Sequence, residues 1–445
     1  MATTAKIASE EQGRDHGLVR AMGVFTFAAA ITNEVVGSGI YRLPASMASA
    51  AGTSAPYAYL ACLVAMAAIV LCFSEAGSRV PTSGGPYGYV EAAFGKGTGF
   101  VAGVLLWLSS VLACGGISAA LADVVASAFP VMSGLGQRYA VILGVLGLMT
   151  WINVIGVDLA SRILGWATAI KLLPLLLFIV VGAGALMAGH GAAAPVSNPP
   201  NRDLGHALIL AMFALTGMET PLAASGEVKN PSRTIPRALM LAMGSIGLLY
   251  IAIQLIADAL LGAGLVGSRA PLADALATIA PYWRAPLLVG AFGSMLIWLG
   301  SDILGAPRVL FAFARDGLLP APLGRVHPRF RTPHVAILTH SVLAAALAIT
   351  GTFEKLAILS TLAIAPLYAS VCAAAVRLRR RDVAILGRPL ALPALPLIAA
   401  FAIVSTIVLV ALAKWSEIFA LAGVLVGASL LYLVMRPKNL IGYFR

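Results

Sequence analysis

The sequence predicts an all-α integral membrane protein with twelve transmembrane helices, and its composition and hydropathy pattern carry this prediction. Of its 445 residues 60% are hydrophobic and 11% are charged, whereas about 25% of an ordinary soluble domain is charged. A soluble globule of this size needs far more polar side chains to cover its surface, but surrounding lipid removes that need. The mean hydropathy of +0.93 agrees with a membrane protein.

Twelve apolar runs of about 18 residues or more define the predicted spans. They cover residues 20–51, 55–79, 97–129, 136–157, 163–188, 204–226, 236–265, 284–314, 333–351, 354–376, 393–413 and 415–435. The first 17 residues are polar and the run after them exceeds a signal-peptide core, so no cleaved signal is expected.

The distribution of basic residues predicts the orientation. When alternate gaps between spans are assigned to opposite sides, one side collects 21 Lys and Arg residues and the other 7. Lys and Arg are enriched in cytoplasmic loops, so both termini are predicted to be cytoplasmic. The expected location is the inner, cytoplasmic membrane of the cell, as a multi-pass protein with the lipid bilayer as a partner. Because the basic residues lie in short gaps and not on one exposed face, no nucleic-acid partner is expected.

No metal, cofactor or catalytic residue is predicted. All four cysteines lie inside apolar runs, so neither a disulfide framework nor zinc-ligand spacing is present. Almost all histidines are predicted at loops or span ends without ligand spacing; they are His16, His190, His206, His327, His334 and His340. A membrane-embedded enzyme, the alternative from another functional class, would need an assembled nucleophile, acid/base pair or metal cluster.

Glycines interrupt the first and the sixth predicted spans, at residues 37–39 and 216–219. Glycine weakens a helix by about 1 kcal/mol relative to alanine, and broken backbone at membrane depth is tolerated where it lines a cavity. Each break is therefore a candidate wall of a binding site, and the alternative is that the glycines only allow close helix packing. The breaks open two sets of five spans, as in an inverted-repeat transporter.

Five motifs follow one another along the chain. They are GSGIYRLP at 37–44, PTSGGPY at 81–87, FALTGME at 213–219, KNPSRTIPRA at 229–238 and ARDGLLPAPLGRVHPRF at 314–330. In this order they resemble the amino acid, polyamine and organocation superfamily of secondary transporters, over residues 18–436. The resemblance implies a LeuT-like 5+5 inverted repeat with broken helices 1 and 6, two added C-terminal helices, and substrate between the broken helices. The predicted units are tail 1–17, repeats 18–190 and 203–380, helices 391–436 and tail 437–445.

A broken helix offers backbone groups to both ends of an amino acid. The N–H groups that open its second half bind a carboxylate, and the carbonyls that end its first half accept from an α-ammonium group. By resemblance, Phe213 is an aromatic gate over the substrate, and the alternative is a Phe that faces lipid or the core. The predicted substrate-binding residues are Glu34, Val36, Gly37, Ser38, Gly39, Ile40, Phe213, Ala214, Leu215, Thr216, Gly217 and Asp302, with Lys171, Glu219 and Phe213 for coupling and gating.

Ionisable residues inside spans are functional by default, because each costs about 3 kcal/mol on insertion scales. The resemblance places Lys171 where sodium-independent members carry a lysine in place of a bound sodium ion, and Glu219 at a proton-linked switch. In the structural alternatives, Lys171 extends to the cytoplasmic interface and Glu219 caps a half-helix, where the dipole favours a carboxylate. Glu34 and Asp302 depart from the family pattern, and Asp258 is expected to be wetted.

These features predict a secondary active transporter of amino acids that works by alternating access, sodium-independent and proton-coupled. Charge balance favours a cationic amino acid or polyamine, because Lys171 can fully neutralise only one of Glu34 and Asp302. Two alternatives stay open: an exchanger of an amino acid for its decarboxylated amine, and a permease for small neutral amino acids. Whether the chain forms a homo-oligomer also stays open.

Overall fold

The computed structural model describes residues 20–435, apart from residues 38, 83, 156, 192–193 and 199–201 and the side chains of 157–166. Ser38 and the predicted tails 1–17 and 437–445 lie outside the described residues. Within them the chain is helical, and its one extended pairing is an isolated parallel bridge between Met22 and Val228. The α-helices are α2 (Val24–Val35), α3 (Gly39–Ala51), α4 (Ala55–Arg79), α5 (Gly85–Phe94), α6 (Lys96–Ala128), α7 (Leu135–Ile155), α8 (Val157–Met187), α9 (Leu204–Ala214), α10 (Glu219–Leu222), α11 (Pro231–Leu261), α12 (Pro271–Ala277), α13 (Arg284–Gly305), α14 (Pro307–Arg315), α15 (His334–Thr350), α16 (Phe353–Arg380), α17 (Leu395–Ala411) and α18 (Trp415–Met435).

Eight helical segments of the described chain are long and apolar enough to cross a membrane. They are Gly39–Arg79, Lys96–Ala128, Leu135–Ile155, Ala167–Met187, Pro231–Leu265, Pro281–Arg315, Phe353–Arg380 and Trp415–Met435. Four shorter apolar helices, α2, α9, α15 and α17, accompany them. The first segment has 41 residues, about twice the length of one span. Gly52, at φ 58°, turns the chain between α3 and α4 in a left-handed conformation that glycine adopts readily. The chain is therefore an all-helical, multi-pass membrane protein.

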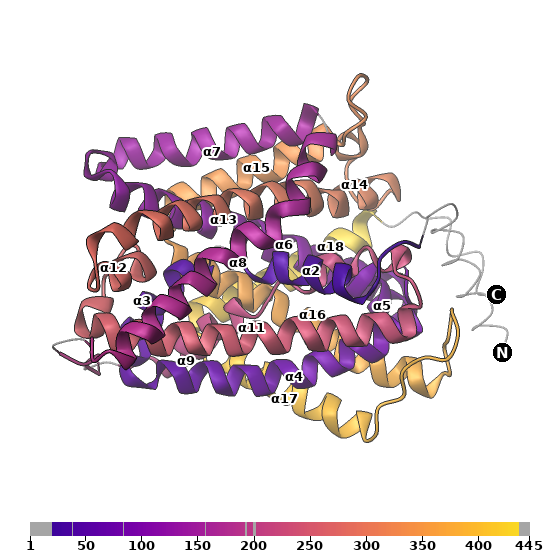
Figure 1. The fold of residues 1–445 in the computed structure, drawn as a ribbon. Helices are drawn as coiled ribbons and strands as arrows, with labels where there is room; N and C mark the ends of the chain where they lie inside the picture. Colours follow the sequence, from indigo (N-terminus) through magenta and orange to yellow (C-terminus); the bar gives the residue numbers. More distant parts are fainter. Residues whose placement is uncertain are drawn as a thin grey trace, which may run out of the picture.

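Most of the long helices run roughly along one direction, and they are stacked in layers (Figure 1). In Figure 1, α7 and α15 lie along one side of the molecule, α4 and α17 along the other, and α6, α8 and α13 between them. Within the bundle α6 packs against α16 and α15, α11 against α4 and α2, and α13 against α8 and α6. The short helices interlock, because α3 packs against α9 and α10 packs against α2.

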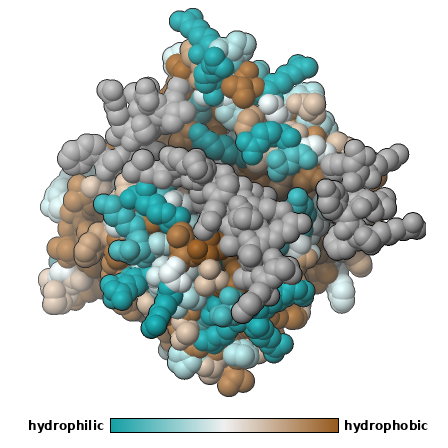
Figure 2. Space-filling model, turned by 90° about the vertical axis from the view of Figure 1, so that its right-hand side faces the viewer, coloured by the Kyte–Doolittle hydropathy of each residue, from teal (hydrophilic) through white to brown (hydrophobic). Residues whose placement is uncertain are grey.

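Apolar side chains face outward on the peripheral helices. On α7, Trp151 and Leu143 are more than half exposed, and on α18 Phe419 and Val434 are exposed further still. Such a surface suits lipid as the solvent, whereas in water it would favour association. The end of the molecule that carries α5 and α14 differs, because hydrophilic side chains gather over that face (Figure 2). These two surface types agree with a bundle that crosses a bilayer.

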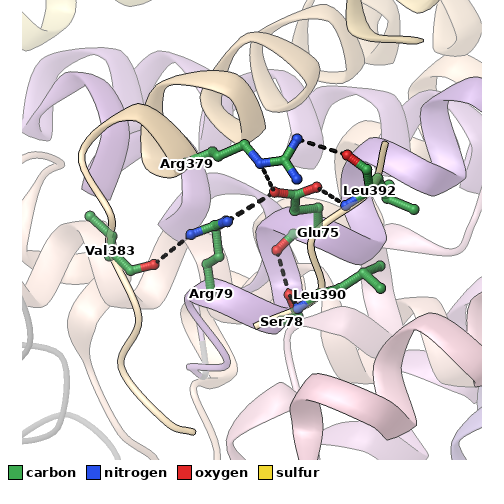
Figure 3. A network of polar contacts seen from close by, with 7 residues as sticks. All are labelled: Glu75, Ser78, Arg79, Arg379, Val383, Leu390 and Leu392. Atoms are coloured by element: carbon green, nitrogen blue, oxygen red, sulfur yellow. Dashed lines mark hydrogen bonds and ion pairs between the residues drawn. The ribbon is translucent and has the colours of Figure 1, made fainter. Parts of the chain in front are cut away.

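A buried carboxylate ties three segments together where α4 ends (Figure 3). Glu75 is fully buried and accepts hydrogen bonds from Arg79 Nη2 and from Leu392 N, each at 3.0 Å. Arg379, at the end of α16, lies 3.2 Å from the same carboxylate through Nε and donates to Leu392 O at 2.8 Å. The pairing satisfies a charge that would otherwise be costly to bury, and it fixes residues 381–394 against α4.

Candidate functional site

The two helix breaks meet at one central cavity of about 50 Å³, which has room for a few water molecules. Of the predicted site residues, those that line it are Glu34, Gly37, Gly39, Ile40, Phe213, Ala214, Thr216, Gly217, Glu219 and Asp302. Val36, Leu215 and Lys171 do not line it, and Ser38 lies outside the described residues. Lining residues that the sequence did not single out are Val35, Leu106, Ser109, Ser110, Ala113, Ile117, Thr220, Tyr250, Trp298 and Ser360.

Gly217 allows the two breaks to touch. Its φ of 118° belongs to a region that side chains other than glycine rarely adopt, and a Cβ there would lie 3.0 Å from Glu34 O. The same Cβ would lie 3.2 Å from Val35 Cα. The glycine thus permits a backbone-to-backbone approach of α9–α10 to the end of α2.

Three side chains hold the end of α2 through consecutive carbonyls. Lys171 Nζ on α8 donates to Asn33 O at 2.6 Å, Trp298 Nε1 on α13 to Glu34 O at 2.9 Å, and the Tyr250 hydroxyl on α11 to Val35 O at 2.9 Å. The last carbonyls of a helix have no partner within it, so these donors satisfy groups that the break leaves unpaired. Each of the three donors comes from a different helix.

The Lys171 side chain is fully buried and does not reach the surface of the molecule. Its backbone carbonyl accepts a hydrogen bond from the Tyr41 hydroxyl of α3 at 3.3 Å. Ser301 of α13 donates to the Glu34 carboxylate. A fully buried ammonium group needs hydrogen-bond partners. The Asn33 carbonyl of the broken first helix is one such partner of Lys171.

Several backbone groups of the predicted amino acid clamp are already paired. Gly37 N donates to Val35 O at 2.7 Å, so this N–H is not free for a carboxylate, in contrast to the prediction. Phe213 O accepts from the Thr216 hydroxyl at 2.8 Å and is likewise occupied. The N–H groups of Gly39 and Ile40 open α3 and have no acceptor in that helix. Among the described residues, the carbonyls of Val36 and Ala214 accept no hydrogen bond.

Glu219 closes the second break. Its carboxylate accepts hydrogen bonds from Gly217 N at 3.1 and 3.2 Å and from the Tyr368 hydroxyl of α16 at 2.7 Å. The side chain is buried, and its contacts are those of a cap on unpaired backbone. This geometry favours the structural alternative that the sequence left open for Glu219.

Phe213 lies on the cavity wall and is 7% exposed. Its ring packs edge-on against Phe353 of α16, with ring centroids 6.0 Å apart. A Cβ on Gly39 would lie 3.2 Å from Phe213 Cε1. The ring therefore covers the start of α3, where the N–H groups of Gly39 and Ile40 have no acceptor among the described residues.

A polar cluster lies beside the cavity at Asp302. The Asp302 carboxylate accepts a hydrogen bond from Ser110 of α6 and lies 3.0 Å from His340 Nε2 of α15. Cys114, Asp302 and His340 bring their ligand atoms within 4.8 Å of one another, the one described group of three that could hold a metal ion. Asp302 contacts Ser110 and His340 through hydrogen bonds. His340 is fully buried inside α15, so it is an exception to the expectation that almost all histidines lie at loops or span ends.

Sequence reasoning missed two features, although the signal for both was available. His340 lies inside the predicted span 333–351, and Glu75 and Arg79 lie inside the predicted span 55–79. The rule that singled out Asp302, an ionisable side chain within an apolar run, applies equally to these residues. Their partners come from distant segments and could not be read from a single sequence.

Comparison with known proteins identifies the family. Residues 22–435 match the family described as amino acid permease. The chain is 26% identical to the branched-chain amino acid permease BcaP of Bacillus subtilis, with 96% of this chain and 95% of that protein covered. It is 28% identical to the serine/threonine exchanger SteT of Bacillus subtilis, covering 82% and 85%, and 29% identical to the cadaverine/lysine antiporter of Escherichia coli K12, covering 68% and 69%.

The names of these three relatives describe transporters and not enzymes. They also confirm the resemblance to the amino acid, polyamine and organocation superfamily that the five motifs predicted. The chain therefore belongs to the amino acid permease family of membrane transport proteins.

Proposed function

We propose that this permease is a sodium-independent secondary active transporter of amino acids that works by alternating access and couples to protons. Its proposed architecture is a LeuT-like pair of inverted five-span repeats, residues 18–190 and 203–380, followed by two helices in 391–436. Counting α2 with α3 and α9 with α10 as single broken spans, the long and short apolar helices group into twelve. The excess of Lys and Arg on one side supports cytoplasmic termini.

The observation that carries this proposal is the pairing pattern of the two breaks. The free N–H groups of Gly39 and Ile40 lie at the positive end of the α3 dipole, which suits the carboxylate of an amino acid. The unpaired carbonyls of Val36 and Ala214 lie at the C-terminal ends of the first half-helices and suit its α-ammonium group. Phe213 covers the bound molecule as the proposed gate.

Lys171 is the proposed substitute for a bound sodium ion. Its buried ammonium group already donates to a carbonyl of the broken first helix, the kind of contact that a cation would make there. A fixed positive charge at this place would repel a second cation. Transport is therefore proposed to proceed equally well when sodium is replaced by choline.

The side chain of the substrate is proposed to be small and neutral. The expectation of a cationic substrate rested on a charge count in which Lys171 was the one cation available to Glu34 and Asp302. That count omitted His340, which is within hydrogen-bond distance of Asp302. With this partner present, a proton held by the pair can balance the charge in place of a substrate cation. Ala113, Ile117 and other apolar residues also line the cavity.

Counterflow in proteoliposomes tests the proposal. Vesicles are loaded with one unlabelled amino acid of a panel, and exchange of a labelled amino acid is measured with sodium or choline outside. We expect exchange of small neutral amino acids in both media. Accumulation driven by a sodium gradient would contradict the role of Lys171. Displacement of bound alanine by excess arginine, lysine or putrescine would instead support the expectation of a cationic substrate. Equal exchange without any response to a pH gradient would favour the exchanger alternative.

A further inference from the structure

The cluster at Asp302 has a feature that two other buried carboxylates, Glu219 and Glu75, lack. Glu219 is occupied by Gly217 N and the Tyr368 hydroxyl, and Glu75 by Arg79 and Leu392 N, so both act as filled acceptors. Asp302 instead pairs with a side chain that can itself take a proton. His340 Nδ1 is buried and has no hydrogen-bond partner among the described residues. A buried polar nitrogen without a partner lowers the stability of the fold, and such groups are rare in native structures.

We propose that the Asp302–His340 pair carries the proton that moves with the amino acid. This inference rests on the proposed transport function and names the group behind its coupling. When the ring is neutral with its hydrogen on Nδ1 and the Nε2 lone pair faces the carboxylate, the pair has a charge of −1 in a buried site. One proton that arrives through the carboxylate and binds Nε2 makes the pair neutral, and its return to water on the other side completes the step. No other bond forms or breaks.

Position connects the pair to the cavity. Asp302 and Ser110 line the cavity, whereas His340 lies behind Asp302 and is fully buried. A proton can thus reach the pair from water in the cavity through the carboxylate and pass to the ring. His340 is a positioning and proton-holding residue that makes no contact with the proposed substrate groups.

The groups around Asp302 come from α6, α15 and α2, and those around Glu34 from α13 and α8. Ser110 and Cys114 belong to α6, His340 to α15, and Glu34 to α2, where Ser301 and Lys171 surround it. Among the described side chains, the ion-pairing partner of Asp302 is His340, and no lysine or arginine pairs with it. The side chain that faces Asp302 is therefore an imidazole, which can gain or lose a proton, and not a fixed cation.

A structural path leads from the pair to the broken helix. Asp302 follows Ser301 on α13, and Trp298 lies one turn earlier on the same helix. Ser301 donates to the Glu34 carboxylate and Trp298 Nε1 to the Glu34 carbonyl. A change in the charge of Asp302 therefore acts on α13, the helix that holds the end of α2, where the amino acid is proposed to bind. Protonation and substrate binding can thus bias the same conformational equilibrium.

His340→Gln tests the inference, because glutamine can still donate to Asp302 but cannot take up a proton. Reconstituted wild type and variant are compared in counterflow at equal pH and in accumulation driven by a pH gradient. With one proton per substrate, a gradient of one pH unit concentrates substrate about tenfold in the wild type. We expect His340→Gln to retain counterflow and to show no accumulation. His334→Gln on the same helix and Cys114→Ala in the same cluster should behave like the wild type.

Tenfold accumulation by His340→Gln would overturn the inference, as would an equal loss of accumulation in Cys114→Ala or His334→Gln. A wild type that shows no counterflow of any amino acid would instead refute the proposed function. A second measurement needs no variant: calorimetry of amino acid binding to the wild type in buffers of different ionisation enthalpy counts the protons taken up. We expect uptake of about one proton per bound amino acid near neutral pH. Zero uptake would contradict the inference even if the variant does not fold.

Discussion

Gly37→Ala should weaken substrate binding through Trp298, and the size of the effect can be worked from the structure. A Cβ at Gly37 would lie 2.8 Å from Cδ1 and 3.0 Å from Nε1 of the Trp298 indole, closer than real Cβ contacts. Overpacking of this kind costs about 1–3 kcal/mol, and displacing the indole also removes its hydrogen bond to Glu34 O, worth about 1 kcal/mol. If the substrate-binding conformation bears this cost, Kd rises about tenfold or more, since 1.4 kcal/mol is a factor of ten.

Equilibrium binding of the labelled amino acid identified by counterflow measures this effect on purified protein. The matched control is Gly293→Ala on α13, whose Cβ would meet Ile170 Cγ2 at an ordinary 3.8 Å. Trp298→Phe should partly rescue Gly37→Ala, because a smaller ring leaves room for the Cβ. The coupling energy between the two changes should then be about 1 kcal/mol or more. A Kd for Gly37→Ala within about twofold of the control, or additive losses in the double variant, would refute the reasoning.

Three further predictions follow from the contacts described. Phe213→Ala should raise Kd or slow exchange more than it lowers thermal stability, because its ring covers the cavity; wild-type exchange kinetics would place the gate elsewhere. Lys171→Met should abolish transport in choline and in sodium, because it leaves Asn33 O unpaired at a cost of about 1–3 kcal/mol; retained uptake would argue against the substitute-cation role. Glu75→Ala should lower the free energy of unfolding by about 3–5 kcal/mol, because it leaves buried arginine unpaired. The exposed control Asp316→Ala should cost about 1 kcal/mol or less, and equal losses in thermal denaturation would contradict the role of the Glu75 network.

The sequence predicted those parts of the fold that depend on local chemistry. Hydropathy and charge identified a multi-pass helical protein. Gly37, Gly39 and Gly217 marked both interruptions, because glycine lacks a Cβ and its conformational freedom is a property of the residue type. The apolar surroundings of Lys171 in the sequence likewise indicated a buried cation.

What the sequence could not supply was the partner of each polar group. Asp302 and His340 lie on different helices, and their contact depends on how α13 and α15 pack. The charge count that favoured a cationic substrate therefore omitted His340, the partner of Asp302. The occupied state of Gly37 N–H has the same origin, because its pairing depends on the dihedral angles of the break and not on residue type.

A cryo-electron microscopy map of the protein with bound amino acid tests the central claim most directly. We expect density between the two breaks, with the carboxylate at Gly39 N and Ile40 N, the ammonium group near the carbonyls of Val36 and Ala214, and Phe213 over the side chain. The structure also contains a larger pocket lined by Tyr57, Asp258 and neighbouring residues. Amino acid density in that pocket, with the space between the breaks empty, would contradict the account.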